Sequence, residues 1–199
     1  MNFLINDLNI KPEEKRSDKH LDNLKKFFVD HITDIRPTAN IFLKKSVIVN
    51  QNYKKNIDLN ISNEHFVEFK SISSSFGKNA NNRIEEMVGQ CYLINNIGKL
   101  SYVFVYHDVE EEFKYYNRIK GVAQDLLDIN LLHSVVLYKV TNQKVVQDPD
   151  LNFDLFLRSM DKNEKSTHNR WFKRILQSIC LRSKRIISRA TNRWHKRIY

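Results

Sequence analysis

The sequence predicts an α/β protein in which a mixed central sheet is flanked by helices. Helical and strand-like apolar patterns alternate along the chain, an order typical of a sheet covered by helices. One strand-like run, SYVFVYH at residues 101–107, is nearly all apolar or aromatic, as expected of a central strand buried on both faces. The chain has 199 residues and is 41% hydrophobic, so it can form one domain of ordinary size with a sizeable core.

The first elements are a helix and three strands. Pro12 and two following acids are typical of a helix start, and apolar residues then recur at helical spacing, which predicts a helix over residues 13–34. Residues 41–50 are rich in β-branched side chains and residues 57–61 alternate apolar and polar ones, so both are expected to be strands. A turn at residues 63–64 leads to a third strand over residues 65–72, which predicts a hairpin.

The later elements alternate between helix and strand. A polar loop over residues 73–78 is expected to precede a helix over residues 81–95, whose apolar side chains recur at helical spacing. After the buried strand at residues 101–107, the same patterns predict a helix at 115–130, a strand at 134–141 and a short helix at 151–160.

The net charge of +10 is unevenly distributed. Residues 165–199 contain 11 Lys or Arg and no Asp or Glu, whereas residues 1–164 contain 22 basic and 23 acidic residues. Apolar side chains at 172, 175, 176, 179, 186 and 187 have helical spacing. The chain is therefore divided into a nearly neutral domain, residues 1–164, and a basic helical arm, residues 165–199.

Several protein classes are disfavoured by composition. No run of 18 apolar residues is present, so no membrane-spanning helix is expected. The first seven residues do not resemble a secretory signal. Cys91 and Cys180 are far apart in apolar helical contexts, which favours two buried thiols over a zinc site. Unpaired thiols suggest a reducing compartment, and we expect the protein to be cytoplasmic.

Asp58, Glu68 and Lys70 form a candidate catalytic group. Glu68 and Lys70 are two residues apart on one predicted strand, so they share a face, and Asp58 lies on the neighbouring strand. Two carboxylates can hold Mg²⁺, which polarises a phosphate and activates water, while a lysine can orient or deprotonate that water or offset transition-state charge. Charges also alternate on ordinary exposed strands, but here the flanking Val67 and Phe69 are apolar and are expected to face the other way.

The segment after this strand carries a more specific pattern. Residues 68–90 read EFKSISSSFGKNANNRIEEMVGQ, and they resemble the XhoI family of type II restriction endonucleases, which have PD-(D/E)xK nuclease cores. The family pattern is matched at Ser75, Phe76, Gly77, Asn79, Asn81, Asn82, Arg83, Glu85, Glu86 and Gly89. Lys78 and Ala80 depart from it.

The similarity extends, less specifically, over residues 17–160. Lys19, His20 and Asp22 are similar to a patch on the family's first helix, and residues 53–59, 102–108 and 116–124 are similar to later segments. The resemblance implies a restriction-endonuclease-like fold. It also implies Mg²⁺-dependent cleavage of double-stranded DNA at a short palindrome by a homodimer, with catalytic Asp58, Glu68 and Lys70 and with Asp58 and Glu68 as metal ligands.

The matched segment also has the chemistry of DNA contact. Asn and Arg side chains bond adenine and guanine edges, and free N–H groups at a helix start bind phosphate. We therefore expect DNA contacts from Ser75, Lys78, Asn79, Asn81, Asn82 and Arg83. Alternatively, Asn81 or Asn82 caps the helix.

Three acids are candidates for supporting roles near the metal. Glu85 and Glu86 fall in the first turn of the predicted helix, where interaction with the helix dipole would be sufficient to explain them. Either could instead support the metal ligands. Asp22 on the first helix has the same two interpretations, a metal-site role or simple surface exposure.

Other functions remain open at this point. The chain could be another PD-(D/E)xK nuclease, acting in repair, junction resolution or element mobility. It could also be a catalytically dead protein that binds DNA or a membrane. The basic arm could contact phosphates, lie on an anionic membrane or pack on its own domain or a partner chain, and we favour DNA contact or dimer packing.

Overall fold

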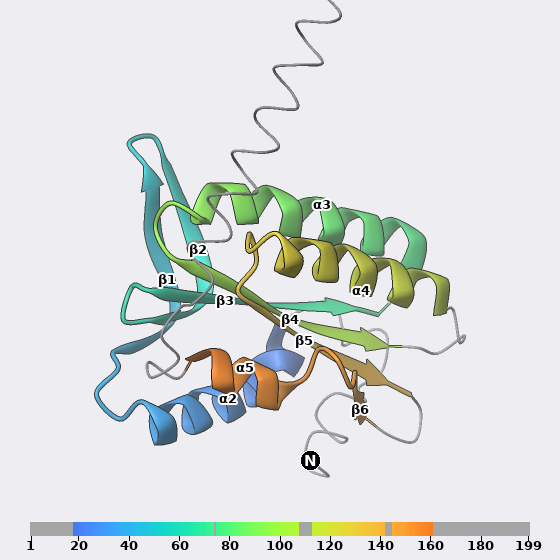
Figure 1. Ribbon diagram of the computed structural model, residues 1–199, viewed down its shortest axis with the longest axis horizontal. Helices are drawn as coiled ribbons and strands as arrows, with labels where there is room; N and C mark the ends of the chain where they lie inside the picture. Colours follow the sequence, from blue (N-terminus) through green and yellow to red (C-terminus); the bar gives the residue numbers. More distant parts are fainter. Residues whose placement is uncertain (1–17, 74, 108–112, 142–144, 161–199) are drawn as a thin grey trace, which may run out of the picture. The chain divides into compact units, whose positions relative to one another are not determined.

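The computed structural model describes residues 18–73, 75–107, 113–141 and 145–160 of the chain. These residues form a six-stranded mixed sheet with helices on both faces (Figure 1). The predicted α/β class with a mixed, helix-flanked sheet is therefore confirmed. The basic arm predicted over residues 165–199 lies outside the described residues, which all belong to the unit Met1–Asp161.

The strands follow one another across the sheet in chain order. Neighbours are antiparallel from the first strand to the third, parallel from the third to the fifth, and antiparallel at the far edge. The strands are β1 (Ile41–Asn50), β2 (Tyr53–Ile61), β3 (His65–Ile72), β4 (Lys99–His107), β5 (Ser134–Val140) and β6 (Val145–Gln147).

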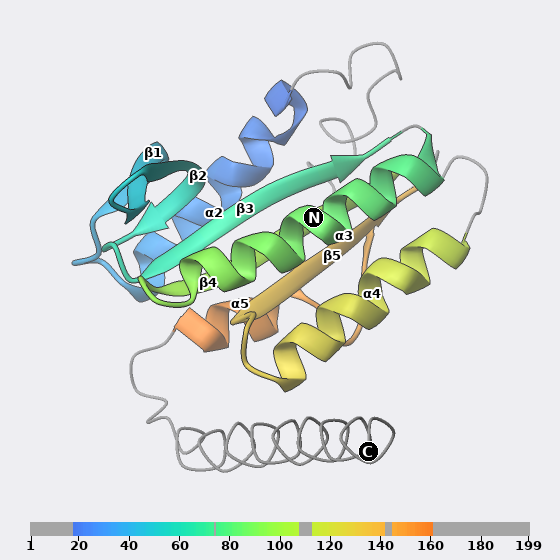
Figure 2. The same cartoon turned by 90° about the horizontal axis from the view of Figure 1, so that it is seen from above.

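Two helices cover each face of the sheet (Figures 1 and 2). One face packs against α3 (Phe76–Ile94) and α4 (Phe113–Asp128). The other packs against α2 (Asp22–Ile35), which follows the short 3-10 helix η2 (Asp18–Leu21), and against α5 (Phe153–Met160). Residues alternate between the two cores along β3: Phe66 and Ile72 belong to the first core, and Val67 and Phe69 to the second.

Most element predictions agree with the structure. The strands at 41–50 and 65–72 and their hairpin partner are confirmed, although β2 begins at residue 53 and β5 ends at 140. The first helix is confirmed from residue 22 to its end near Arg36, while residues 13–17 lie outside the described ranges. The short strand β6 was not predicted.

The start of α3 corrects the prediction. The helix begins at Phe76, so residues 76–78 are not a loop and residues 79–83 lie within the helix. Ser75 occupies the N-cap position, so neither Asn81 nor Asn82 caps the helix. No acid lies in the first turn, and the helix dipole therefore does not account for Glu85 and Glu86.

Two further expectations can be compared with the described residues. Cys91 is buried, as predicted, and burial raises the pKa of its thiol to about 12, whereas Cys180 lies outside the described ranges. Within those ranges, none of the helices is both long enough and apolar enough to cross a membrane.

Candidate active site

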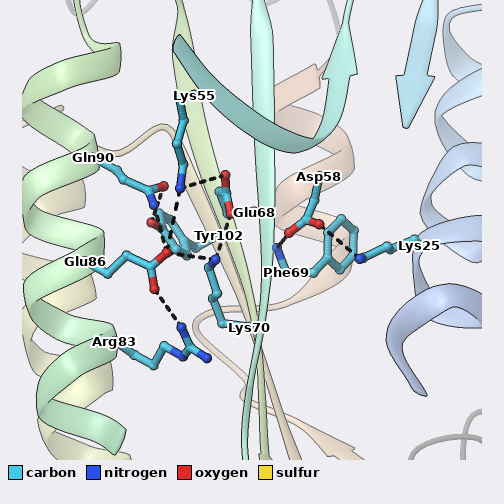
Figure 3. Close-up of polar contacts among 10 residues, drawn as sticks. All are labelled: Lys25, Lys55, Asp58, Glu68, Phe69, Lys70, Arg83, Glu86, Gln90 and Tyr102. Carbon is cyan, nitrogen blue, oxygen red and sulfur yellow. Dashed lines mark hydrogen bonds and ion pairs between the residues drawn. The ribbon is translucent and has the colours of Figure 1, made fainter. Parts of the chain in front are cut away.

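Glu68 and Lys70 point from β3 toward α3, as the alternation of the strand requires (Figure 3). Lys70 Nζ lies 2.9 Å from Glu68 Oε2. Only 2% of the Glu68 side chain is exposed, and 14% of the Lys70 side chain. Burial of an isolated charge is costly, and here the carboxylate of Glu68 and the ammonium of Lys70 each offset the cost of burying the other.

Glu86 on α3 completes the group. Its Oε1 atom lies 2.9 Å from Lys70 Nζ, so the lysine bridges two carboxylates. Arg83 Nη1 donates to Glu86 Oε2 at 2.8 Å, and Gln90 Nε2 donates to Glu86 Oε1 at 2.9 Å. Arg83, Glu86 and Gln90 are three and four residues apart, which places all three on one face of the helix.

A second lysine and a tyrosine surround the carboxylates. Lys55 Nζ on β2 lies 4.0 Å from Glu68 Oε1 and 3.9 Å from Glu86 Oε1. Tyr102 is the register partner of Glu68 on β4, and its hydroxyl donates to Gln90 Oε1 at 2.7 Å. Glu68 Oε1 is buried and has no hydrogen-bond partner among the described residues. Glu68 Oε1 is therefore a buried acceptor of this group that lacks a hydrogen-bond donor.

The charges of the group depend on one another. Burial raises the pKa of Glu68, with a smaller contribution from Asp58, while Lys70 and Lys55 oppose the rise. Burial would lower the pKa of Lys70, but Glu68 and Glu86 together outweigh burial and raise it. Burial would raise the pKa of Glu86, but Lys70 and Arg83 outweigh it and lower the pKa. The two carboxylates beside Lys70 therefore favour its charged form in this arrangement.

Asp58 lies on the other side of β3 from this group (Figure 3). Its Oδ1 accepts a hydrogen bond from Lys25 Nζ at 3.0 Å, and its Oδ2 accepts from the backbone N–H of Phe69 at 3.0 Å. Lys25 comes from α2, and its side chain is 3% exposed. The structure thus brings Glu68 and Lys70 together, and it engages Asp58 with different partners.

The position of Asp58 follows from a local change in the strand. Leu59 belongs to the core under α2, whereas Ile57 belongs to the core under α3, although a regular strand would place both on one face. On β1, Lys44 lies opposite Asp58 and has a φ of 51°, in the left-handed region. β2 pairs with β3 only from Leu59 to Ile61, so Asp58 marks the fork where the two strands separate.

The site has the donor chemistry for Mg²⁺. Asp58 and Glu68 supply hard carboxylate oxygens from opposite sides of β3, and one Glu68 oxygen is unsatisfied. Among the described residues, no three His, Cys, Asp or Glu side chains are already grouped as ligands. A cation on Asp58 would compete with the ammonium of Lys25, which already donates to Oδ1.

The residues predicted to contact DNA line the first turns of α3 or precede it. Lys78 and Asn82 are exposed, as is Ser75 at the N-cap. Asn81 Oδ1 accepts from Arg118 Nη1 at 2.7 Å, an exposed hydrogen bond that joins α3 to α4. Asn79 is half-buried, and Arg83 belongs to the group around Glu86.

The three candidate supporting acids have different positions. Glu86 contacts Lys70 directly. Glu85 is exposed on the same helix, and no contact joins it to the group around Lys70 among the described residues. Asp22 is about half exposed, and its Oδ1 lies 4.0 Å from Lys25 Nζ. Of the three, Glu86 is the one that the structure joins to the candidate catalytic residues.

Sequence reasoning missed Lys25, Lys55 and Gln90. Lys25 had a usable signal, because it follows Leu24 within the apolar stripe of the first helix, where a cation needs a buried partner. Lys55 and Gln90 had no such signal in the sequence, because their contacts depend on how β2 and α3 pack together.

Comparisons of the chain with protein-family models, with curated proteins and with solved structures gave no match.

Proposed function

We propose that the protein is a Mg²⁺-dependent endonuclease of the PD-(D/E)xK type, with the restriction-endonuclease-like fold. The observation that carries this proposal is the buried Glu68–Lys70 pair on one face of β3, with an unsatisfied Glu68 oxygen and Asp58 on the adjoining strand. The pattern of residues 68–90 supports cleavage of double-stranded DNA at a short palindrome by a homodimer.

In this proposal Asp58 and Glu68 would hold Mg²⁺, which supplies Lewis acidity and lowers the pKa of bound water. Lys70 is a charged donor that offsets negative charge on the phosphate as the phosphodiester bond is attacked. Glu86 orients the Lys70 ammonium and keeps it protonated. Lys55 adds a second positive charge beside the carboxylates.

Incubation of plasmid DNA with the purified chain and Mg²⁺ tests the proposal. We expect discrete fragments from the wild type and none from Asp58→Ala, Glu68→Ala or Lys70→Ala. Removal of a central catalytic group typically costs several orders of magnitude in rate. Glu85→Ala is the matched control, because Glu85 is exposed next to Glu86, and it should cleave normally.

The variants must be shown to fold, because Lys70→Ala leaves two carboxylates without their shared cation. Urea unfolding and circular dichroism provide that check, and Lys70→Arg retains the positive charge. Full activity in a folded Asp58, Glu68 or Lys70 variant would contradict the assigned site. Smeared or structure-dependent products would indicate a nuclease of another kind on the same core.

A second candidate is a DNA-binding protein that does not cleave. The observation in its favour is that internal partners already occupy the site, since Lys70 is held by two glutamates and Asp58 by Lys25. This candidate predicts DNA binding without Mg²⁺-dependent cleavage, and equal binding by wild type and Lys70→Arg.

A further inference from the structure

The β1–β2 hairpin continues beyond the body of the sheet. At its base, residues 59–61 pair with β3 and residues 41–43 pair with residues 59–61, whereas the outer part, residues 44–57, is not paired with β3. Figure 1 shows this outer part rising from the sheet as a two-stranded ribbon. We call residues 44–57 the ribbon.

The ribbon combines positive charge with exposed apolar surface. It contains Lys44, Lys45, Lys54 and Lys55 and no Asp or Glu. Among the described residues, ten large hydrophobic side chains are exposed, and two of them, Ile48 and Tyr53, belong to the ribbon. The most exposed is Ile48, at 66%. Such a surface indicates an interaction site for an anionic partner.

One face of the ribbon is already used by the protein itself. Val47 and Ile57 are buried in the core under α3, and Lys55 lies beside Glu68 and Glu86. The opposite face is left exposed, with Ile48 paired across the strands to Lys54. The ribbon therefore leads directly from solvent to the candidate active site.

The tip of the ribbon carries amide side chains. Asn50, Gln51 and Asn52 are consecutive and exposed at the turn between the strands. Asn50 Oδ1 accepts a hydrogen bond from the Asn52 backbone N–H at 2.9 Å, which fixes the turn. The side chains of Gln51 and Asn52 remain exposed to an approaching partner.

We propose that the ribbon enters the major groove of duplex DNA, with Gln51 and Asn52 against base edges and Lys44 and Lys54 against phosphates. A two-stranded ribbon fits the major groove, which is about 12 Å wide, and does not fit the minor groove, which is about 6 Å wide. Asn and Gln are the side chains that bond adenine bidentately in that groove. The proposal deepens the nuclease proposal and rests on it for the role of the bound DNA.

Two other occupants fit the ribbon less well. Insertion into a membrane would remove three amide side chains at the tip from water, and an amide that leaves water without a hydrogen-bond partner is costly to bury. Pairing of two copies through β1 would bring the lysines of one ribbon near those of the other, which is repulsive. Duplex DNA offers phosphates to the lysines and base edges to the amides.

The first test measures binding of a labelled duplex by fluorescence anisotropy in EDTA, over a range of salt concentrations. The double variant Lys44→Gln/Lys54→Gln should bind more weakly, and its salt slope should fall by about 1.8, because each phosphate contact contributes about 0.9. Lys26→Gln/Lys99→Gln is the matched control, since both lysines are exposed on α2 and β4, and its slope should not change. An unchanged slope in the ribbon variant would overturn the proposal.

The second test selects bound duplexes from a random pool. We expect the wild type to enrich a short motif, and Gln51→Ala/Asn52→Ala to lose about tenfold in discrimination at one or two positions. An identical motif, or no motif with the wild type, would overturn base contact by the tip. Tight binding of the wild type to phosphatidylserine–phosphatidylcholine vesicles, abolished in the ribbon variant, would assign the ribbon to a membrane. Dimerisation abolished in that variant would assign it to a second copy.

Both tests are independent of cleavage because EDTA removes the metal. If the ribbon variants lose DNA affinity but the wild type never cleaves, the ribbon proposal holds and the nuclease proposal fails. If the wild type cleaves and the ribbon variants bind normally, the ribbon proposal alone fails.

Discussion

The pair Lys25–Asp58 determines what Asp58 can do. One oxygen of the carboxylate accepts from the almost fully buried Lys25 ammonium, and the other accepts from the Phe69 N–H. The aspartate therefore ties α2 to β3 at the fork between β2 and β3. A cation bound by Asp58 would compete with the Lys25 ammonium, while Lys25 and the Phe69 N–H together hold the carboxylate in position.

Lys25→Met should destabilise the fold by about 3 kcal/mol, because it leaves a partly buried carboxylate without its cation. Urea unfolding measures the change. Asp22→Asn is the control, since Asp22 is half exposed at 4.0 Å from the same lysine, and we expect a cost below about 1 kcal/mol. The double variant Lys25→Met/Asp58→Asn should recover part of the loss. Equal effects of Lys25→Met and Asp22→Asn would show that the Asp58 pair is unimportant.

The same variant reports on metal binding without an activity assay. If Asp58 is a metal ligand, Mg²⁺ should raise the unfolding midpoint of Lys25→Met more than that of the wild type, because the competing ammonium is gone. Equal Mg²⁺ shifts in the two proteins would argue that Asp58 serves only to join α2 and β3.

At the scale of elements, two glycines differ in whether the structure leaves room for a side chain. Gly89 lies inside α3, and a Cβ placed there would meet nothing within 4 Å among the described residues. Gly98 precedes β4, and a Cβ there would lie 2.7 Å from the Glu64 carbonyl oxygen and closer still to the Phe66 ring. The first glycine only weakens its helix, whereas the second is required by close approach of two chain segments.

Gly89→Ala should therefore stabilise the protein by about 0.5 to 1 kcal/mol, and Gly98→Ala should destabilise it by more than that. Thermal or urea unfolding of the two single variants measures both signs. A destabilising Gly89→Ala would mean that something outside the described residues approaches α3 closely at this point.

The element patterns in the sequence predicted most of the sheet, because runs of β-branched or alternating apolar and polar residues coincide with the strands. The start of α3 was predicted too late, since residues 76–83 contain glycine and three asparagines, which favour turns in isolation. Packing overrides that preference: Ala80 is fully buried and continues the stripe of Met87, Cys91 and Ile94. If Ala80 had been identified as a core residue, the predicted helix would have started earlier.

The candidate site was predictable only where the strand is regular. Period-two alternation placed Glu68 and Lys70 on one face, and the structure agrees. The same rule could not place Asp58, because β2 changes faces between Ile57 and Leu59. Glu86 is part of the group because it lies on the face of α3 that is turned toward β3, which the predicted first-turn position did not indicate.

For the whole molecule, charge is the feature that organises the proposals. Residues 1–164 carry 22 basic and 23 acidic residues, yet the ribbon within them holds four lysines and no acid. The domain thus has a local positive surface on a nearly neutral body. Residues 165–199 add 11 basic residues and no acidic one, so they account for the whole excess charge of the chain.

Deletion of residues 165–199 changes the net charge from +10 to −1, and it should weaken DNA binding and flatten its salt dependence. Removal of one phosphate-bound cation lowers the salt slope by about 0.9, so if several of the 11 cations bind phosphates, their deletion would remove several units of slope. Anisotropy titrations of the full and shortened chains measure this in EDTA.

The deletion and the ribbon variant Lys44→Gln/Lys54→Gln should have additive effects on the slope if they act on different phosphates. An unchanged slope together with a loss of dimers in sedimentation would instead assign these residues to packing between chains, and a loss of vesicle binding would assign them to a membrane surface.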